Sequence, residues 1–469
     1  MGTYPDTIGI VVTPGDARYD TARHLWNARF DYRPRAVVYP RNAEETAAAL
    51  TYVRDQGIPF RIRSGGHNSE GFSGLDDGAV IDVSRLGALA VSGDRTRADL
   101  GPGVLLGEAY DALWSLGGTI PAGVCPDIRI GGHVLGGGIG MLVRSRGLLI
   151  DHLLGLTLVD AHGQILDVDA ERHPDLLWAS RGGGGGNFGI VTSYSFAMRP
   201  ISEVTLFLLE WGARDGIAAL DAWQHWIRDA DPRVNARFNL FPASADRALT
   251  TGLFEGASEE LTQLLRPLTD ACPPRTTSAR TLPYGDSIGT WTEQVSSIRA
   301  KFTPALAAEP LGAEALHILE RRHDKAPPGV KTGIYGLGGA VLSDVPPEHS
   351  AFAHRGASLC VEYLGHWSDP QADAEHLGWL SGTREDMLPF MTGGAYVNSP
   401  DRDLTNWPHA YYGEHLPRLM EVKRRYDPDG VFAFEQSIPA SLSPAAARAA
   451  GLPATTVADL RARGLLTAR

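Results

Sequence analysis

Along the first 200 residues, short apolar runs alternate with longer segments in which apolar residues recur every three or four positions. Apolar runs between turn residues predict strands, and the longer periodic segments predict helices. The predicted strands span 34–40, 59–63, 79–83, 155–160 and 189–196. The predicted helices span 43–57, 104–117 and 174–180. Asn42 and Glu45 have the spacing of a capping box before the first of these helices. The order of strands and helices predicts an α+β domain.

After Pro200 the glycine clusters become sparse and the pattern changes. Strands are predicted at 203–211, 236–241, 248–255, 333–342 and 357–365. Helices are predicted at 215–230 and at 259–271, the second capped by Ser258. Alternation in the last strand places Leu359, Val361 and Tyr363 on one face. Cys360, Glu362 and Leu364 then lie on the opposite face. This half of the chain predicts a second domain, a sheet with helices over one face.

The C-terminal part of the sequence is less regular. Residues 411–439 predict one helix followed by an extended end. Residues 441–469 are Ala-rich, and they fit either a helical appendage or a frayed tail.

Composition and charge narrow the class of protein. With 43% hydrophobic and 21% charged residues, the chain has the usage of a globular protein. Its net charge of −12, without a basic run, argues against nucleic acid and anionic membranes as partners. No run of 18 apolar residues predicts a membrane span, and the first 25 residues lack the pattern of a signal peptide. Three cysteines make a disulfide framework improbable, so a cytoplasmic location is expected.

Two glycine-rich loops carry the candidate chemistry. The first is RSGGHNSEGFSG at 63–74, directly after a predicted strand. Glycines in such a loop let backbone N–H groups approach a phosphate closely. His67 in this loop could be a general base, a metal ligand, a nucleophile or a partner of its own loop. No partner stands at metal-ligand spacing, since Asp76 and Asp77 are typical turn residues, so no metal site is predicted.

The second loop, GVCPDIRIGGHVLGGGIGM at 123–141, contains Cys125. A lone cysteine is often an inert, buried side chain. A cysteine in a loop before a helix N-terminus can instead have a lowered pKa and react as a thiolate. A Rossmann-type dinucleotide site is not favoured. Residues 136–141 lack the third glycine in register, and 182–189 lead into a strand rather than a helix.

In combination, these loops resemble those of a known family. RSGGHNSEGFSG, GVCPDIRIGGHVLGGGIG, RGGGGGNFGIVTS at 181–193 and the elements YYG, YDPDGVF and EQSIP within 411–439 resemble the berberine bridge enzyme-like flavoprotein oxidases. These belong to the vanillyl-alcohol oxidase class, with an FAD-binding domain of the PCMH type. The resemblance implies that 1–200, completed by 403–440, form the FAD-binding domain. It also implies a substrate-binding domain at 201–402, with 441–469 as an appendage.

The resemblance implies a bicovalently bound FAD. The loop histidine of the family bonds the flavin 8α carbon and the cysteine bonds flavin C6, and His67 and Cys125 stand at those positions. His133 matches the position that supports negative charge near flavin N1 and C2=O. The remaining positions implied to contact the cofactor are Arg63, Ser64, Gly65, Gly66, Asn68, Ser69, Gly123, Ile128, Gly131, Gly132, Gly137, Gly138, Gly140, Asn187, Phe188, Gly189, Val191 and Gln436.

Oxidation of an alcohol also needs a base beside the carbon that loses hydride. Positions of the family's substrate site are occupied by Glu362, Tyr396, Tyr411 and Tyr412, and we expect Tyr411 to act with Glu362 as its partner. Two positions depart from the family. Arg129 replaces a common glycine, and its cation either binds an acidic substrate or points outward. Ser399 stands where a tyrosine is frequent, which enlarges the pocket or removes a proton-handling group.

The expected function is therefore that of an FAD-dependent oxidase. An alcohol, hemiacetal or amine of a bulky natural product or glycoside would transfer hydride to flavin N5, and O₂ would reoxidise the flavin to give H₂O₂. Ile128 is at the family's O₂ gate, and a β-branched residue there favours the oxidases. Bacterial tailoring of secondary metabolites such as antibiotics is the expected context, with a small-molecule substrate and a monomer or homodimer. The alternatives are a dehydrogenase or cyclase with another acceptor, and a non-catalytic flavin-binding protein.

Overall fold

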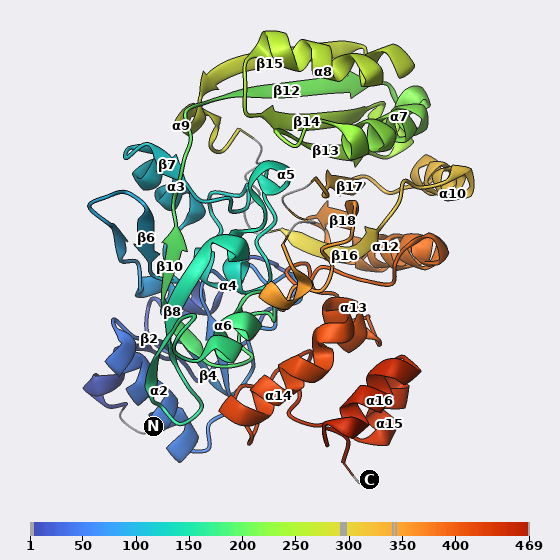
Figure 1. Ribbon diagram of the computed structural model, residues 1–469. Helices are drawn as coiled ribbons and strands as arrows, with labels where there is room; N and C mark the ends of the chain where they lie inside the picture. The colour runs from blue at the N-terminus through green and yellow to red at the C-terminus, as the bar shows by residue number, and fades with distance from the viewer. Residues whose placement is uncertain (1–3, 291–297, 340–341, 343–344, 468–469) are drawn as a thin grey trace.

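A computed structural model describes residues 4–290, 298–339, 342 and 345–467. Figure 1 shows a large sheet with its helices at one end of the molecule and two smaller sheets toward the other. The first smaller sheet has the order β1 (Ile10–Val12), β2 (Ala36–Tyr39), β4 (Ala79–Asp82), β3 (Phe60–Arg63). Its β2, β4 and β3 are parallel, and β1 is antiparallel to β2. The other is antiparallel, with the order β5 (Leu89–Val91), β6 (Arg97–Leu100), β10 (Ile190–Ala197), β8 (Leu153–Val159), β9 (Ile165–Val168).

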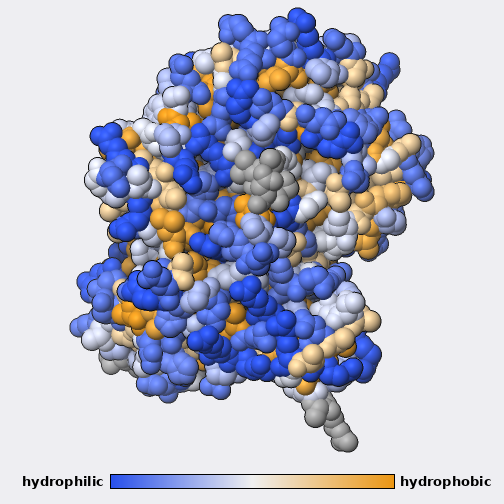
Figure 2. Space-filling view, in the orientation of Figure 1, coloured by the Kyte–Doolittle hydropathy of each residue, from blue (hydrophilic) through white to orange (hydrophobic). Residues whose placement is uncertain are grey.

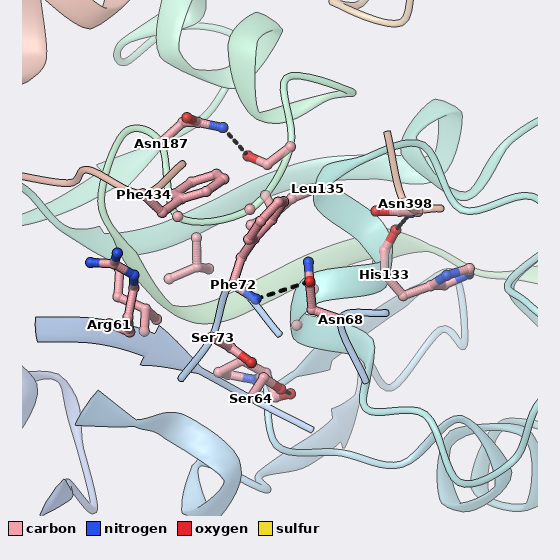
Figure 3. Close-up of a pocket in the computed structure, with 18 of the residues that line it drawn as sticks. Arg61, Ser64, Asn68, Phe72, Ser73, His133, Leu135, Asn187, Asn398 and Phe434 are labelled. Atoms are coloured by element: carbon pink, nitrogen blue, oxygen red, sulfur yellow. Dashed lines mark hydrogen bonds between the residues drawn. The ribbon is translucent and has the colours of Figure 1, made fainter. Parts of the chain in front are cut away.

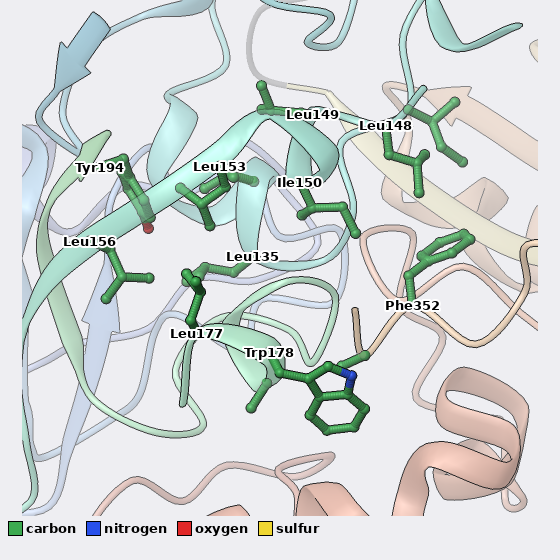
Figure 4. Packing of buried hydrophobic residues seen from close by; sticks show 14 of the residues in the cluster. Leu135, Leu148, Leu149, Ile150, Leu153, Leu156, Leu177, Trp178, Tyr194 and Phe352 are labelled. Carbon is green, nitrogen blue, oxygen red and sulfur yellow. The ribbon is translucent and has the colours of Figure 1, made fainter. Parts of the chain in front are cut away.

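Short helices connect and cover these sheets, and a pair of two-residue strands lies nearby. The helices are α1 (Tyr19–Arg23), α2 (Ala43–Asp55), α3 (Leu106–Trp114), α4 (Ile130–Leu135), α5 (Val143–Arg146) and α6 (Pro174–Ser180). The paired short strands are β7 (Gly118–Thr119) and β11 (Arg199–Pro200). Figure 4 shows part of the buried core, where Leu135 of α4 lies among Leu153, Leu177 and Tyr194. This core fixes the glycine-rich segment around α4 in place.

The large sheet is antiparallel throughout. Its order is β15 (Thr276–Pro283), β12 (Glu203–Trp211), β14 (Ala248–Phe254), β13 (Val234–Leu240), β17 (Val330–Gly336), β18 (Leu359–Trp367), β16 (Arg299–Ala307). One face is covered by α7 (Gly216–Asp229), α8 (Ser258–Ala271), α10 (Ala313–Asp324) and α12 (Asp373–Met387). Leu359, Val361 and Tyr363 pack under these helices, as the alternation predicted, and Glu362 therefore lies on the opposite face.

The C-terminal segment returns to the smaller sheets. Its helices are α13 (Trp407–Tyr412), α14 (Leu416–Tyr426), α15 (Pro444–Ala449) and α16 (Ala454–Ala462). One further short helix, α9 (Tyr284–Ser287), lies between β15 and β16 in the chain. Leu460 and Leu465 are buried, and an Arg424 guanidinium nitrogen donates to the Gly464 carbonyl at 3.0 Å. Of the two alternatives for 441–469, the helical appendage is therefore correct. The domain boundaries themselves stay a prediction.

Some local predictions need correction. Ser258 is the first residue of α8 and its hydroxyl caps nothing; the N-cap residue is Ala257. Asn42 does accept from the Glu45 amide, but the Glu45 carboxylate accepts from the Arg41 amide rather than from Asn42. The strand predicted at 333–342 ends at Gly336, and its residues 340–341 lie outside the described residues.

The visible surface in Figure 2 is mostly hydrophilic, with hydrophobic residues in small groups. Only Leu154, Ile165 and Leu388 are large hydrophobic residues classed as exposed within the described residues. In the same part of the chain, no helix has the length and apolar character needed to cross a bilayer.

Candidate functional site

A cavity runs between the two smaller sheets and the C-terminal segment. Its empty space, open mouth included, is about 1460 Å³. Figure 3 shows side chains that line it, among them Ser64 and Asn68 from the loop after β3, and Phe434 from the C-terminal segment. The Asn68 side-chain oxygen accepts from the amides of Glu70 and Phe72 at 3.1 Å, which holds this loop in its turn.

His67 lies in the wall of this cavity. Its ring stacks on Trp26, with centroids 5.3 Å apart and an interplanar angle of 23°. Burial lowers the pKa of His67 to about 4, although the Asp127 charge opposes the shift. The imidazole is therefore neutral at physiological pH and has a lone pair, which is the form that can add to an electron-poor carbon. Sequence reasoning did not identify Trp26, whose position before β2 gave no motif signal.

Cys125 differs from its prediction in one respect. Burial raises the pKa of its thiol, and the nearby cation of Arg237 opposes that shift without reversing it. The predicted lowering by a helix N-terminus is wrong because α4 begins only at Ile130 and is six residues long. Cys125 itself is not part of the cavity wall, but the two reactive loops do touch. A methyl group on Gly65 would come within 3.3 Å of Arg129, four residues beyond Cys125.

Glycines of the cavity wall fit a large ligand that approaches the backbone. A Cβ on Gly132 would meet nothing within 4 Å, and one on Gly185 would meet only atoms 3.7 Å or more away. Both residues line the cavity, so a side chain at either position would fill space that is now open. The donor-rich, glycine-lined wall suits a pyrophosphate and its dinucleotide. Gly185 was quoted in the motif but not predicted as a contact.

The structure sorts the predicted site residues into two groups. Those that line the cavity are Ser64, Gly65, Gly66, His67, Asn68, Ile128, Gly131, Gly132, His133, Asn187, Gly189, Val191, Tyr411, Tyr412 and Gln436. Those that do not are Arg63, Ser69, Gly123, Cys125, Gly137, Gly138, Gly140, Phe188, Glu362 and Tyr396. Residues that line the cavity but were not predicted as site residues include Arg61, Phe72, Ser73, Leu135, Asn398 and Phe434.

Several residues of the second group have packing or anchoring roles. The Arg63 guanidinium pairs with Asp82 and donates to the Ala22 carbonyl, so it holds strands together beneath the loop. Gly140 packs against backbone, since a Cβ there would lie 1.8 Å from the Ala122 carbonyl oxygen. The Tyr396 hydroxyl accepts from the amides of Gly138 and Ile139 at 3.0 and 3.1 Å. Burial also raises the Tyr396 pKa, so the geometry disfavours this tyrosine as a base.

His133 anchors the loop that carries Cys125. Its Nε2 accepts from the Gly123 amide at 2.8 Å, and Figure 3 shows its ring pointing away from the other labelled side chains. Burial lowers the pKa of His133 to about 4, so the ring is neutral and its Nδ1 carries the proton. A fixed positive charge at this position is therefore not available.

The helix-free face of the large sheet carries a polar cluster near Cys125. Glu362 is paired across the strands with Gly333, and its Oε1 accepts from the Ser399 hydroxyl at 2.5 Å. A guanidinium nitrogen of Arg237 lies 3.7 Å from the other Glu362 oxygen. The Arg237 guanidinium also stacks over the Tyr335 ring, 4.6 Å from its centroid. Arg237 and Tyr335 were missed because strand pairing, not spacing, brings them together.

Tyr411 and Tyr412 face the cavity from the end of α13. The Tyr411 hydroxyl donates to Gln436 Oε1 at 3.1 Å and accepts from the Asp401 amide at 2.9 Å. The Tyr412 hydroxyl donates to the Gly183 carbonyl at 3.1 Å. Burial raises the Tyr411 pKa, and the nearby carboxylates of Asp401 and Glu70 raise it further. This environment disfavours Tyr411 as a tyrosinate base, and among the described residues its hydroxyl contacts Gln436 and the Asp401 amide rather than Glu362.

A buried ion cluster joins these segments. The Lys301 ammonium on β16 donates to Glu70 at 2.8 Å and to Asp401, and both carboxylates are almost fully buried. Thr303 adds a hydroxyl donor to the second Asp401 oxygen at 2.5 Å. Glu70 belongs to the loop of His67, and the Asp401 amide donates to Tyr411. Lys301 was not predicted, although a lysine inside an apolar strand is an unusual signal.

The two ambiguous positions are also placed. The Arg129 guanidinium donates to the Gly103 carbonyl, so it lies in the cavity wall beside the His67 loop and does not point outward. Ser399, which stands where a tyrosine is frequent in the family, donates a hydrogen bond to Glu362. Within the described residues, no three His, Cys, Asp or Glu side chains are grouped so as to hold a metal ion.

Two family models match parts of this chain. A family model described as an FAD binding domain matches residues 34–169, and one described as berberine and berberine like matches residues 395–439. An FAD-linked oxidoreductase of Bacillus subtilis, YgaK, is 37% identical over 92% of this chain and 97% of its own length. The chain belongs to the berberine bridge enzyme-like family of FAD-linked oxidoreductases.

Enzymes of stated substrate and solved structures are also similar to this chain. Glucooligosaccharide oxidase of Sarocladium strictum is 29% identical over 88% of this chain and 89% of its own. The solved structure of BBE-like 1 from Physcomitrella patens matches with a TM-score of 0.86 at 28% identity, covering 92% of this chain and 96% of that one. That of aclacinomycin oxidoreductase matches with a TM-score of 0.85 at 27% identity, over 92% and 100%. The α+β fold and an oxidoreductase activity with FAD follow from the family.

Proposed function

We propose that this protein is an oxidase with bicovalently bound FAD. It oxidises a CH–OH group of a glycoside or a bulky natural product and reduces O₂ to H₂O₂. The observation that carries this proposal is the position of His67 in the cavity wall, with the loop that carries Cys125 in contact with the His67 loop. The imidazole of His67 is neutral. A carrier that held FAD without covalent bonds would need neither His67 nor Cys125.

FAD, when bound, supplies the acceptor for the hydride and passes the two electrons to O₂. The residues of this chain hold the cofactor and manage the proton. His67 and Cys125 would anchor the flavin ring at two of its edges, and the open backbone at Gly132 would admit the pyrophosphate. A flavin attached in this way can leave one face open to a large substrate, because its retention does not depend on burial.

The base is Glu362 in this proposal, and not Tyr411. The Glu362 carboxylate lies on the sheet face whose charges act on the Cys125 thiol, so it is next to the proposed attachment point. Ser399 fixes one of its oxygens, and Arg237 lies near the other. A carboxylate held in this way can accept the hydroxyl proton while the carbon loses hydride. Overall, the alcohol becomes a carbonyl, and O₂ receives two electrons and two protons.

The substrate class rests on two kinds of support. The helix-free sheet face carries the polar side chains of Arg237 and Glu362, and named relatives act on glucooligosaccharides and on aclacinomycin. Ile128 lines the cavity next to the Cys125 loop, where a β-branched side chain would control access of O₂. Both points favour an oxidase of sugars or of glycosylated secondary metabolites.

The covalent bonds are tested by acid precipitation of the purified protein. The pellet should stay yellow in the wild type and in either His67→Ala or Cys125→Ala, and it should lose its colour in the double variant. Release of all flavin from the wild-type pellet would overturn the bicovalent proposal. Peroxide formation from sugar and phenolic alcohol donors in air tests the oxidase. Reduction that requires an artificial acceptor would instead identify a dehydrogenase.

A further inference from the structure

The polar cluster on the helix-free face of the large sheet has a cation at its centre. Register places Arg237 of β13 opposite Tyr335 of β17, and Gly333 of β17 opposite Glu362 of β18. The side chain of Arg237 crosses over Gly333, where a Cβ would meet a guanidinium nitrogen at 2.4 Å. Glycine at 333 is thus required for the guanidinium to reach the Glu362 strand.

Arg237 has an unusual lack of hydrogen bonds for a buried guanidinium. Its Nε is buried without a hydrogen-bond partner. Its Nη2 lies 3.7 Å from Oε2 of Glu362, which is beyond hydrogen-bond distance. Within the described part of the chain, Arg237 donates no hydrogen bond. Its side chain is about 19% exposed, so a guest on this face can reach it. Buried donors without partners are costly, and a guest with acceptor oxygens would remove that cost.

The surroundings favour an anionic guest. Arg237 and Lys331 both act as cations on the Cys125 thiol. The Lys331 ammonium and the Arg247 guanidinium both lie over the ring of Phe241, and the guanidinium carbon is 4.3 Å from the ring centroid. Glu362 is the carboxylate of the sheet face itself, and as the proposed base it is committed to the hydroxyl proton. Arg247 and Lys331 thus add positive charge at the Phe241 end of β13, while Glu362 and Asp127 act as anions on the Cys125 thiol.

We propose, on the basis of the function proposed above, that the substrate is an alcohol that also carries a carboxylate, and that Arg237 binds this carboxylate. Two nitrogens of a planar guanidinium can donate to both oxygens of a carboxylate at once. The same contact would orient the hydroxyl toward Glu362, whose distance from Arg237 fixes the spacing between the two groups on the substrate. Acidic sugars and hydroxymethyl aromatic acids have this chemistry.

Donor pairs that differ only in the carboxylate test the specificity. Suitable pairs are galactose with galacturonate and benzyl alcohol with 4-(hydroxymethyl)benzoate, assayed for peroxide at constant ionic strength. The acidic member should have the higher kcat/KM by at least about 10-fold, since a charge-assisted pair is stronger than a neutral hydrogen bond. Arg237→Gln should remove this preference chiefly through KM, and Arg237→Lys should restore part of it.

Arg233→Gln is the matched control. Arg233 lies four residues before Arg237, also stacks on an aromatic ring, Phe254 at 5.0 Å, and already pairs with Asp231. The Arg233→Gln variant removes one positive charge from the same region, and it should leave the preference for the acidic donor unchanged. Flavin content and melting temperature of each variant report whether it has folded.

Binding of benzoate to the flavin-loaded protein, measured by calorimetry, tests the inference without turnover. Wild type should bind it, and Arg237→Gln should weaken binding by at least about 10-fold. No benzoate binding by the wild type, or equal binding by Arg237→Gln, would overturn the carboxylate site. Failure of every donor, acidic or neutral, to reduce the flavin would overturn the proposed oxidase instead. Equal kcat/KM for both members of each pair would overturn the proposed substrate class alone.

Discussion

The hydroxyl of Ser399 donates a 2.5 Å hydrogen bond to Oε1 of Glu362. This bond joins the loop that precedes α13 to the strand β18, two segments that the sequence places 37 residues apart. Ser399 and Glu362 are both at least nine-tenths buried, so the carboxylate has one fixed orientation. The next residues of the same loop, through the Asp401 amide, hold Tyr411. The loop therefore positions the carboxylate and the tyrosine independently of each other.

The first prediction concerns the base. Glu362→Gln keeps the size of the side chain but cannot accept a proton, so kcat should fall by about 10²–10⁴-fold. Ser399→Ala removes one hydrogen bond of about 1 kcal/mol from the carboxylate, and kcat should fall roughly 5-fold. Tyr411→Phe should change kcat little, because its hydroxyl is held by Gln436 and Asp401. Anaerobic stopped-flow reduction of the flavin measures all three.

The comparison of Glu362→Gln with Tyr411→Phe decides between the two bases. A large loss of the reduction rate in Tyr411→Phe with little loss in Glu362→Gln would return the base to Tyr411, as the family motif first suggested. Equal covalent flavin in each variant is the control, since it shows that the cofactor site is intact.

A second prediction follows from the buried cluster of Lys301, Glu70 and Asp401. Lys301→Met would leave the buried Asp401 carboxylate without its cation and Glu70 with only the partly exposed Arg402, and a broken buried pair typically costs about 3–5 kcal/mol of the free energy of unfolding. Guanidinium titration with flavin fluorescence and circular dichroism measures the loss. Because Glu70 is part of the loop that carries His67, the rate of flavin attachment should fall as well.

The triple variant Lys301→Met, Glu70→Gln, Asp401→Asn is the matched control for this cluster. It removes all three charges together, so most of the lost stability should return. A loss below about 1 kcal/mol in Lys301→Met would show that the cluster is hydrated and carries little of the stability.

Much of the fold was predictable because the hydrophobic pattern is strong where elements are buried. The strands at 203–211 and 357–365 and the helix at 215–230 match β12, β18 and α7 within two residues. The missed strands lack that pattern. Seven of the eight residues of β15 are exposed at the sheet's edge, and β16, at the other edge, contains Pro304 and Lys301. Edge strands need no apolar alternation, so their sequence does not reveal them.

The candidate site divides in the same way. Its cofactor half consists of local loops, so a motif could identify His67, Asn68 and Gly132 as parts of one wall. Its substrate half is assembled by pairing between distant strands, as in Arg237 with Tyr335, which are 98 residues apart. No spacing rule predicts such a pair. Burial raises the Cys125 pKa, whereas the sequence predicted that a helix N-terminus would lower it. That prediction failed because α4 is short and begins only at Ile130.

A third prediction contrasts two glycines of one segment. Gly132 lies within α4, and a Cβ there meets nothing within 4 Å, whereas one at Gly140 would lie 1.8 Å from a backbone oxygen. Gly132→Ala should fold with equal or slightly greater stability, since alanine favours a helix by up to about 1 kcal/mol. It should nevertheless take up much less FAD, because its methyl group enters the cavity. Gly140→Ala should instead lose stability. Melting temperature and flavin content distinguish the two, and full flavin in Gly132→Ala would contradict this placement of the cofactor.

The last prediction concerns the pH dependence of flavin attachment. Burial raises the Cys125 pKa, so the reactive thiolate is a small fraction at neutral pH and grows about 10-fold per pH unit while the pH stays below that pKa. Burial lowers the pKa of His67 to about 4, so its neutral form is already complete at pH 6.5. Flavin-free protein from riboflavin-starved cells, mixed with FAD, should therefore attach flavin faster at pH 8.5 than at 6.5 in His67→Ala, which keeps Cys125. In Cys125→Ala, which keeps His67, the two rates should agree. Intact-mass spectrometry over time measures both, and a pH-independent rate in His67→Ala would show that the thiol is already ionised before FAD binds.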